Sequence, residues 1–284
     1  MISSHLAWLI RRHGVEMTHL SGGSHIASIL SVADIVAVLY SDVLHFDCKN
    51  PKLAERDRFI LSKGHAGAAI YAALAESGFF STEELKTHYQ NGSRLSGHVS
   101  HKGVPGVEFS TGSLGHGLPV AAGMAHAAKL DAKQHRVYVV MGDGECDEGS
   151  VWEAAMYANH YGLNNLVAII DHNKMQSLDY CENTMKLSPF AEKWRSFGWN
   201  CLEIDGHDHD ELRAAFEDAK NSDKPTAIIA NTVKGKGISF MEFDILWHYR
   251  FPHDGWEYDG ALKELHAQMP KGLSDPYEKE AENA

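Results

Sequence analysis

A Gly-Asp-Gly triplet and a more distant asparagine are the residues whose types and spacing could do chemistry. Gly142-Asp143-Gly144 follows the apolar run 136–141, and Asn173 closely follows the apolar run 165–170. Both runs are short and rich in β-branched residues, which is typical of buried strands. Residues 148–161, between them, have helical spacing, so the unit is strand–helix–strand. Because parallel strands end at the same edge of a sheet, we expect Asp143 and Asn173 to meet there.

The chemistry of these side chains indicates a metal ion. Carboxylate and amide oxygens suit a hard divalent cation. The glycines of the triplet allow the backbone to approach a phosphate closely. The pattern therefore favours a cation that bridges the protein to a phosphorylated ligand, with a diphosphate as the first choice. The simpler alternative is that Asp143 only caps the following helix.

The remaining chain predicts an α/β fold with a mainly parallel sheet flanked by helices. We expect strands at 58–61, 136–141, 165–170, 199–205 and 226–232. We expect helices at 31–44, 64–77, 115–130, 148–161, 190–197, 209–220 and 259–268, and helical spacing also runs through 6–20. Residues 88–113 are rich in Gly, Ser and His and predict a long loop, which in a compact domain usually carries function.

Composition bounds the class of protein. No Pro- or Ser-rich linker divides the chain, so we expect a single domain over 1–270 and a loose, polar C-terminal tail over 271–284. The net charge of −12 argues against non-specific nucleic-acid binding. The four cysteines lack metal-binding or CxxC spacing, which indicates reduced thiols and a cytoplasmic location. We find no stretch of about 18 apolar residues, so no association with a membrane is expected.

Four further blocks accompany the triplet: Gly22-Gly-Ser-His-Ile26, Ser62-Lys-Gly-His65, Ser110-Thr-Gly-Ser-Leu-Gly-His-Gly117 and Asp205-Gly-His-Asp208. In this order they resemble the N-terminal half of a transketolase. More closely, they resemble the separately encoded N-terminal subunit of split bacterial transketolases, over roughly residues 5 to 270. The Gly-Asp-Gly…Asn unit is common to thiamine-diphosphate enzymes, whereas the His65 and Thr-Gly-Ser-Leu-Gly blocks are more specific to transketolases.

The resemblance implies the thiamine-diphosphate-binding fold (its diphosphate-binding domain) and two cofactors, thiamine diphosphate and Mg²⁺, with Ca²⁺ or Mn²⁺ also possible. It implies transfer of a two-carbon glycolaldehyde unit from a ketose or ketose phosphate to an aldose or aldose phosphate. Thiamine diphosphate would supply the carbanion, and the protein its binding and orientation. Full transketolases continue for several hundred residues. The chain is therefore expected to need a C-terminal partner subunit with the pyrimidine-binding half, in an α₂β₂ assembly.

Site residues carry over by position. Asp143, Asn173 and the main-chain carbonyl of Met175 match the metal ligands. The matching cofactor contacts are His65, Gly112, Ser113, Leu114, Gly144, Asn173 and His248. The candidate catalytic residues are His25, His98 and His248, of which His25 and His98 are expected to handle the substrate carbonyl and hydroxyls. Glu148 resembles an acidic residue at the family's dimer interface. The family's Ser-Gly-His-Pro-Gly is here Gly23-Ser-His-Ile-Ala27, so His25 is kept and the proline is lost.

Other functions stay open at the level of sequence. The alpha subunit of a 2-oxo-acid dehydrogenase shares Gly-Asp-Gly…Asn but should lack the His65 block. A deoxyxylulose-phosphate synthase relative should carry a fused second half. A non-catalytic subunit that only binds the cofactor is the third alternative. Lys234 and Lys236 could meet a phosphate but are expected in a solvated loop, and Trp152 and Met156 are expected in the core.

Overall fold

Five parallel strands form the central sheet of the computed structural model, which describes residues 1–278. They are β1 (Arg58–Leu61), β2 (Val137–Gly142), β3 (Leu166–His172), β4 (Asn200–Asp205) and β5 (Thr226–Asn231). Their order across the sheet is β1-β2-β3-β5-β4, and every neighbouring pair is parallel. The predicted α/β class is confirmed, and each predicted strand lies within two residues of its expected bounds.

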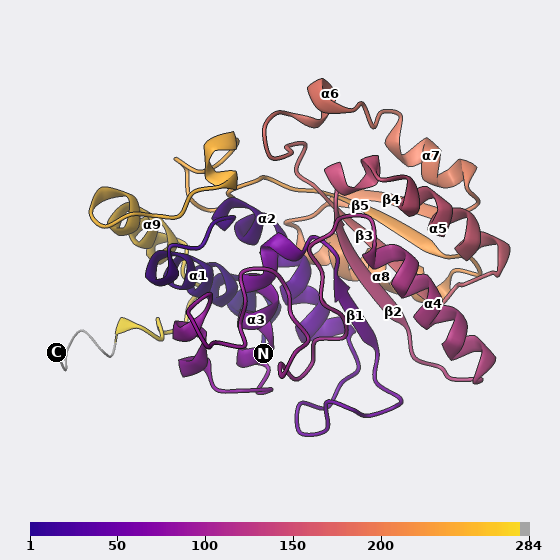
Figure 1. Ribbon diagram of the computed structural model, residues 1–284, viewed down its shortest axis with the longest axis horizontal. Coiled ribbons are helices and arrows are strands. Elements are labelled where there is room, and N and C mark those ends of the chain that lie inside the picture. Colours follow the sequence, from indigo (N-terminus) through magenta and orange to yellow (C-terminus); the bar gives the residue numbers. More distant parts are fainter. Residues whose placement is uncertain (279–284) are drawn as a thin grey trace.

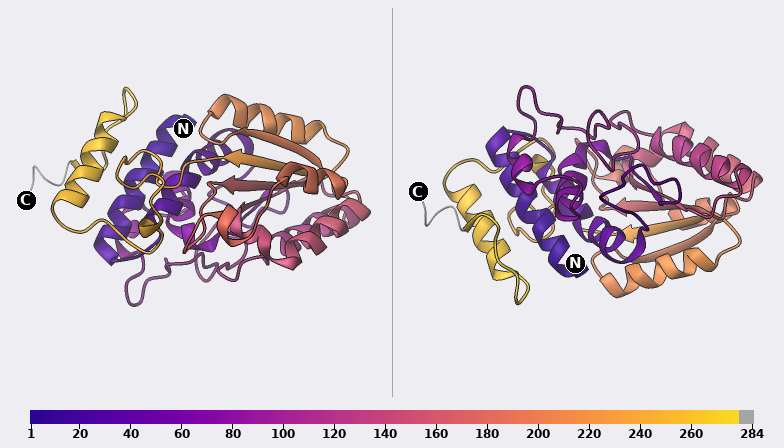
Figure 2. Two further views of the ribbon diagram at one scale, coloured as in Figure 1. Left: turned by 90° about the horizontal axis from the view of Figure 1, so that it is seen from above. Right: turned by 90° about the horizontal axis from the view of Figure 1, so that it is seen from below.

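Helices cover both faces of this sheet (Figures 1 and 2). One face packs against α4 (Gly117–Leu130), α5 (Gly149–His160) and α7 (Phe190–Ser196), and the other against α2 (Ile26–Val38), α3 (Gly67–Glu76) and α8 (His209–Asn221). Side chains along β2 alternate between the two clusters: Val137, Val139 and Met141 join the first, and Tyr138 and Val140 the second. Because both faces of the sheet are buried under helices, side chains on both sides of each strand are apolar. The strands therefore appear in the sequence as continuous apolar runs.

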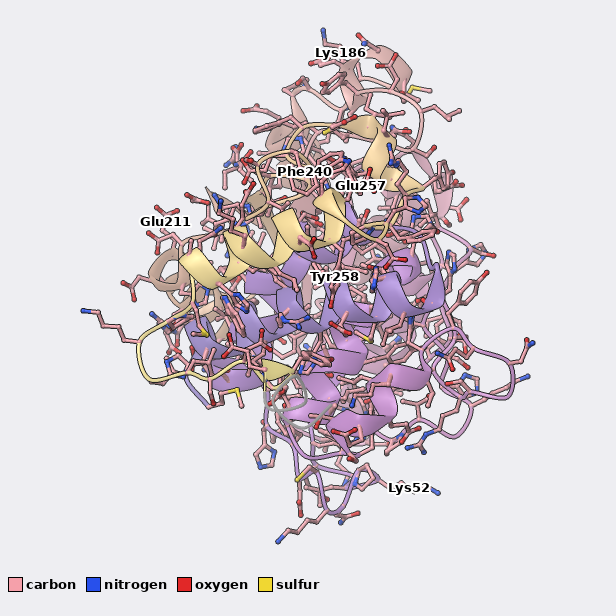
Figure 3. All side chains as sticks on the ribbon, turned by 90° about the vertical axis from the view of Figure 1, so that its left-hand side faces the viewer. Lys52, Lys186, Glu211, Phe240, Glu257 and Tyr258 are labelled. Carbon is pink, nitrogen blue, oxygen red and sulfur yellow. The ribbon has the colours of Figure 1, made fainter. Side chains whose placement is uncertain are left out.

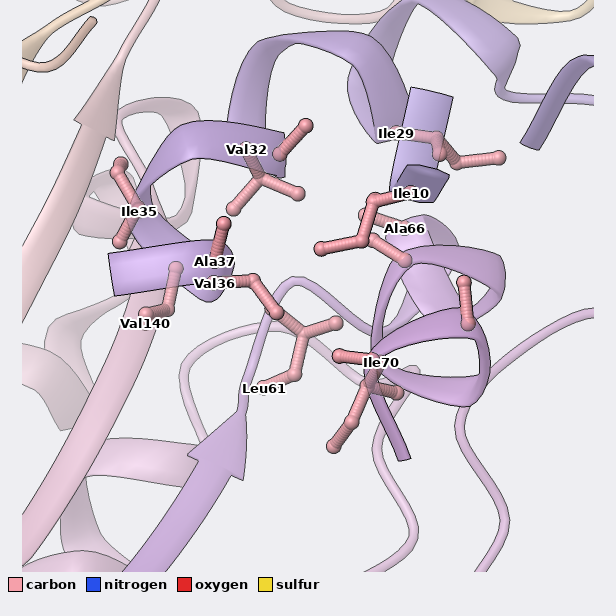
Figure 4. Packing of buried hydrophobic residues seen from close by; sticks show 14 of the residues in the cluster. Ile10, Ile29, Val32, Ile35, Val36, Ala37, Leu61, Ala66, Ile70 and Val140 are labelled. Atoms are coloured by element: carbon pink, nitrogen blue, oxygen red, sulfur yellow. The ribbon is translucent and has the colours of Figure 1, made fainter. Parts of the chain in front are cut away.

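The helix α2 lies at the centre of the second cluster, and all its residues are buried. Figure 4 shows Ile29, Val32 and Val36 of α2 among side chains of α1 (Ser3–Ser21), β1, β2 and α3. The stretch Ile26–Val43 is long and apolar enough to cross a membrane by composition, and 83% of it is buried inside the protein. The expectation that no segment reaches this length and hydropathy is wrong, because a core helix surrounded by apolar neighbours needs no polar face.

Short helical turns complete the chain. They are the π-helix η1 (Leu39–Val43), the 3₁₀ helices η2 (Gly64–Ala66), η3 (Thr82–Thr87), η4 (Gly144–Asp147) and η5 (Ile245–His248), and α6 (Cys181–Thr184). The predicted helix 31–44 begins earlier, at Ile26, and the predicted helix 64–77 divides into η2 and α3. The last helix, α9 (Trp256–Ala267), packs outside α1. Residues 88–113 form the expected long loop.

The expectation of a loose C-terminal segment is wrong for residues 271–278. Asp275 is buried and accepts hydrogen bonds from Arg12 Nε and His266 Nε2, both at 2.7 Å. The Arg12 guanidinium also lies 4.2 Å from the ring centroid of Tyr277. A buried carboxylate therefore holds this segment to the side of the molecule seen in Figure 3. The remainder of the predicted tail, 279–284, lies outside the described residues.

The helix α5 also departs from expectation. Met156 is 54% exposed, whereas Trp152 is half-buried beside Trp194 and Phe197. Helical spacing alone does not distinguish the core stripe of Val151, Ala154, Ala155 and Ala158 from an adjacent exposed position, and Met156 lies outside that stripe.

A buried histidine in the helical layer predicts how stability depends on pH. Burial lowers the pKa of His88 to about 4, below the value of about 6.5 for an unfolded chain. The unfolded state therefore binds more protons between these values, and stability falls as pH drops from about 7 towards 4. We expect His88→Gln to lose less stability than the parent protein between pH 7 and pH 5, measured by urea unfolding.

The exposed His160 on α5 offers a matched control. The His160→Gln variant should keep the pH dependence of the parent protein. Equal slopes for His88→Gln and the parent would remove His88 as a source of the pH effect.

Candidate active site

A cavity of about 380 Å³ opens at the carboxyl edge of the sheet. Its walls come from the segments that follow β1, β2, β3 and β5, together with the start of α2 and the loop 98–114. The three central strands of the sheet, β2, β3 and β5, all end at this cavity. This is the place at which parallel α/β sheets bind ligands, because their loops converge there.

The Asp143 and Asn173 side chains both line the cavity, as the sequence predicts. Asp143 is buried, and its carboxylate accepts hydrogen bonds from Gly144 N at 2.8 Å and Lys174 N at 2.5 Å. Asn173 Oδ1 accepts a hydrogen bond from Met175 N at 3.1 Å. These bonds fix the oxygens and leave further lone pairs free. Burial and the nearby Asp171 raise the pKa of Asp143 to about 6, so a cation at this carboxylate would relieve an electrostatic cost.

A glutamate that the sequence analysis did not single out holds the loops together. Glu145 is buried, and its carboxylate accepts hydrogen bonds from Gly115 N at 2.9 Å and Gly142 N at 3.2 Å and from the Ser62 hydroxyl. Ser62 Oγ in turn accepts a hydrogen bond from Gly117 N at 3.1 Å. One carboxylate therefore connects the ends of β1 and β2 to the loop that precedes α4. In the sequence, the only feature that indicates a role for Glu145 is its place directly after the triplet, in Gly142-Asp-Gly-Glu145.

Lys63, which lines the cavity, forms an ion pair with Asp171. Both side chains are almost inaccessible to solvent. Asp171 also accepts hydrogen bonds from Ser31 Oγ at 2.7 Å and from the Thr232 hydroxyl. Although burial by itself favours the protonated carboxyl, the Lys63 ammonium lowers the pKa of Asp171, so the pair stays ionised. The pair links β1, β3, α2 and the segment after β5.

Lys234 corrects a sequence expectation. It is buried rather than solvated, and its ammonium lines the cavity. Nζ donates hydrogen bonds to the carbonyls of Met175 at 3.1 Å and Gln176 at 3.0 Å, and lies 2.8 Å from His248 Nδ1. Burial and the second ammonium of Lys63 lower the pKa of Lys234 to about 8. Two buried ammonium groups beside the Asp143 carboxylate make this end of the cavity suited to a polyanion.

Four histidines line the same cavity, and one of them, His248, lies beside Lys234. The His25 ring lies 5.2 Å from that of His65, 5.6 Å from that of His98 and 4.9 Å from that of His248, between ring centroids. Burial lowers the pKa of each of the four, that of His25 to about 4, and neighbouring cations add to the effect for His25, His65 and His248. The imidazoles are therefore neutral at pH 7 and can accept a proton or a hydrogen bond.

His25 itself has an unusual backbone. Its φ is 76°, in the left-handed region, and it stands immediately before the first residue of α2. Its Nδ1 atom is buried without a hydrogen-bond partner among the described residues. The left-handed φ of a non-glycine residue and a buried polar atom without a partner both cost folding free energy. Residues with such strain are common at ligand-binding sites. An unpaired nitrogen on a residue that lines a polar cavity fits a position where a ligand completes the hydrogen bonding.

All but one of the predicted site residues line this cavity. Those present are His25, His65, His98, Gly112, Leu114, Asp143, Gly144, Asn173, Met175 and His248. Ser113 is exposed and lies in an adjoining hollow with Phe109 and His116. Glu148 is exposed at the start of α5, next to Gly115. The cavity also contains residues that the sequence analysis did not assign: Ser28, Lys63, Gly142, Glu145, Gln176, Ser177, Lys234 and Tyr249.

The donor set fits a diphosphate with a divalent cation. Within residues 1–278, no group of three or more His, Cys, Asp or Glu side chains could hold a metal ion. The predicted ligand set, however, has one carboxylate, one amide and one backbone carbonyl, which are the hard oxygen donors that Mg²⁺ and Ca²⁺ prefer. The remaining charge of a diphosphate would face Lys63 and Lys234.

Sequence comparison connects this geometry to known proteins. The family described as transketolase, thiamine diphosphate binding domain, matches residues 2–244. This chain belongs to the transketolase family.

Relatives of similar length are named as transketolase subunits. The chain is 43% identical over 263 residues to the 6-deoxy-6-sulfo-D-fructose transketolase subunit SqwG of Clostridium sp. (strain MSTE9), covering 92% of this chain and 95% of that protein. It is 41% identical over 262 residues to an apulose-4-phosphate transketolase subunit of Phocaeicola vulgatus, covering 92% of both. The prediction of an N-terminal transketolase subunit is confirmed, as is the reaction class, ketol transfer, and the comparisons favour this reading over the dehydrogenase and synthase alternatives.

Solved transketolases share the fold but are longer. The structure of transketolase from Campylobacter jejuni superposes with a TM-score of 0.87 at 32% identity, over 94% of this chain and 42% of that chain. Human transketolase is 38% identical over 96% of this chain and 44% of its own length. The transketolase fold and the thiamine-diphosphate-binding domain are thus confirmed, and this chain spans less than half the length of these fused relatives.

The buried ion pair generates a stability prediction. Asp171→Asn keeps hydrogen-bonding groups at the site but leaves the Lys63 ammonium buried without a countercharge. We expect this variant to lose about 3–5 kcal/mol of unfolding free energy, the usual cost of breaking a buried pair. Denaturant unfolding at pH 7 measures the loss.

Asp179→Asn is the control, because Asp179 is a carboxylate on an exposed turn that pairs only with local groups. It should change stability by less than about 0.5 kcal/mol. A double variant, Lys63→Met with Asp171→Leu, should recover part of the loss. If Asp171→Asn and Asp179→Asn unfold at the same denaturant concentration, the pair has no structural role.

Proposed function

We propose that this chain, together with a C-terminal partner subunit, forms a thiamine-diphosphate-dependent transketolase that moves a glycolaldehyde unit from a ketose phosphate to an aldose phosphate. One observation carries the proposal: a single cavity combines the oxygens of Asp143 and Asn173, two buried lysines and four neutral histidines. The first groups suit a metal-bound diphosphate, and the histidines suit proton transfer to and from a sugar.

Different residues would hold the metal ion, the diphosphate and the remainder of the cofactor. Asp143, Asn173 and the Met175 carbonyl would hold Mg²⁺, and Ca²⁺ or Mn²⁺ would suit the same donors. Gly144, His65 and His248 would contact the diphosphate. The segment Gly112, Ser113 and Leu114 would line the remainder of the cofactor, with Ser113 in the least favourable position because it does not line the cavity. Thiamine diphosphate, when bound, supplies the carbanion that the reaction needs.

The substrate end depends on uncharged imidazoles. His25 and His98 are neutral at pH 7, so either ring can accept a proton from a substrate hydroxyl and return it to a developing alkoxide. His248 differs, because the Lys234 ammonium lies 2.8 Å from its Nδ1. That nitrogen must accept from the ammonium, so the ring proton resides on Nε2, which can donate to an oxygen. The three histidines together supply both acceptors and a donor.

The proposal of a partner rests on the names of the relatives. The relatives that this chain covers almost completely are named as transketolase subunits. We therefore propose that a separate C-terminal chain with the pyrimidine-binding half completes the site in an α₂β₂ assembly, with Glu148 at an interface between subunits. All four cysteines are unpaired, which supports a cytoplasmic location.

Asp143→Ala tests the metal and cofactor assignment. Removal of the charged ligand should reduce affinity for thiamine diphosphate in the presence of Mg²⁺ by at least about 100-fold. Isothermal titration calorimetry of the folded protein, with and without a chelator, gives the affinity. The parent protein should lose affinity on chelation, and the variant should not respond to Mg²⁺.

Asp147→Ala provides the matched control, since Asp147 lies on the same turn but outside the cavity lining. It should bind the cofactor within about threefold of the parent. Unchanged, Mg²⁺-dependent affinity in Asp143→Ala would overturn the site assignment.

Co-purification with the C-terminal partner tests the reaction itself. The complex, loaded with Mg²⁺ and thiamine diphosphate, should transfer glycolaldehyde from a ketose phosphate, whereas the chain alone should not. In the complex, His25→Ala should lower kcat by about 100-fold or more, in the range of a lost general acid–base catalyst, while cofactor affinity changes little. A cofactor-loaded complex without transfer to any aldose would favour a non-catalytic, cofactor-binding subunit.

A further inference from the structure

Tyr249 occupies the solvent side of the cavity, outside the cluster of histidines. It lines the cavity, and 59% of its surface is exposed. Its ring lies 5.5 Å from the ring of His25 and 4.7 Å from that of His248, between centroids. Tyr249 is therefore an exposed aromatic ring of the cavity wall close to His25.

The backbone around Tyr249 is held firmly. The preceding turn η5 is capped by Asp244, whose Oδ1 accepts a hydrogen bond from Leu246 N at 2.9 Å. Trp247 on the same turn is buried, and the Arg250 guanidinium lies 4.9 Å from its ring centroid. These contacts on both sides fix the position from which the Tyr249 ring extends.

The Tyr249 hydroxyl, in contrast, has no hydrogen-bond partner within residues 1–278. A phenol anchored at its backbone, with a free donor at its tip, has the form of a ligand contact. The described lining of the cavity contains no arginine, and its two lysines, Lys63 and Lys234, are buried and already engaged by Asp171 and His248. Tyr249 therefore presents an exposed hydroxyl donor at the rim of a cavity whose buried lysines are already paired.

We propose that Tyr249 contacts the part of the sugar beyond the two transferred carbons and so sets which ketose donors this chain accepts. The proposal rests on the proposed function. With the carbonyl at His25, the remaining carbons of an extended ketose lie along the Tyr249 ring. Its face covers their C–H groups, and its hydroxyl donates to one of their oxygens. The substrate class is an open-chain polyhydroxy ketose with at least three carbons beyond the carbonyl carbon.

Donors of different length test this role in the assembled, cofactor-loaded complex. A five-carbon ketose phosphate reaches Tyr249, whereas the four-carbon ketose erythrulose has little to place there. We expect Tyr249→Ala to raise KM for the five-carbon donor by about tenfold, with kcat within about twofold, and to change kcat/KM for erythrulose by less than about twofold. Tyr249→Phe, which removes only the hydroxyl, should raise KM for the long donor by about threefold to fivefold.

Two control variants isolate the contact. Leu246→Ala removes an exposed side chain from the same turn, outside the cavity, and Tyr180→Phe removes a hydroxyl that bonds Phe243 O at 3.3 Å. Both should leave the ratio between the donors unchanged.

Three outcomes would overturn the proposal in different ways. Unchanged kinetics in Tyr249→Ala would show that the ring does not contact the donor. An equal fall in kcat for both donors would show that the ring only positions His25. A parent complex that transfers from neither donor would overturn the proposed function itself, and the Tyr249 assignment with it.

Discussion

Lys63 and Asp171 form an ion pair without access to water, at the edge of the sheet where the ligand-binding loops emerge. A buried charge is tolerated only with a partner and with its remaining hydrogen bonds satisfied. Asp171 therefore draws in Ser31 from α2 and Thr232 from the segment after β5, while Lys63 brings the end of β1. The pair thus fixes the relative positions of four chain segments that are far apart in sequence.

The same pair determines the electrostatics of the cavity. Asp171 is close enough to help raise the pKa of Asp143, and Lys63 helps to lower that of Lys234. Within residues 1–278, the Asp143 carboxylate forms no ion pair, and the Lys234 ammonium contacts only neutral groups, whereas Lys63 is paired with Asp171. A divalent cation and a diphosphate would satisfy both at once. The binding preference arises from charges that the fold buries and leaves without full compensation.

The histidine cluster depends on a different consequence of burial. Imidazoles packed at 5–6 Å between centroids, near two ammonium groups, lose the protonated form. Neutral rings suit a sugar ligand because each can both accept and donate a hydrogen bond at pH 7. The proposed cofactor site lies within this chain, and the proposed substrate site opens to solvent at Tyr249, which is exposed. Such an arrangement leaves room for another chain to complete the substrate side.

The sequence by itself determined the strands, the Gly-Asp-Gly…Asn unit and the family blocks, because strand periodicity and short motifs are local properties of the chain. It placed Asp143, Asn173, His25 and His65, since each belongs to such a motif. Only the tertiary structure decided that Lys234 is buried, that Met156 is exposed and that Asp275 holds the C-terminal segment. Glu145 and Tyr249 likewise gained a place in the site only through folding. Their surroundings come from segments distant in sequence, and burial, pKa and cavity lining are set by those neighbours rather than by the residue itself.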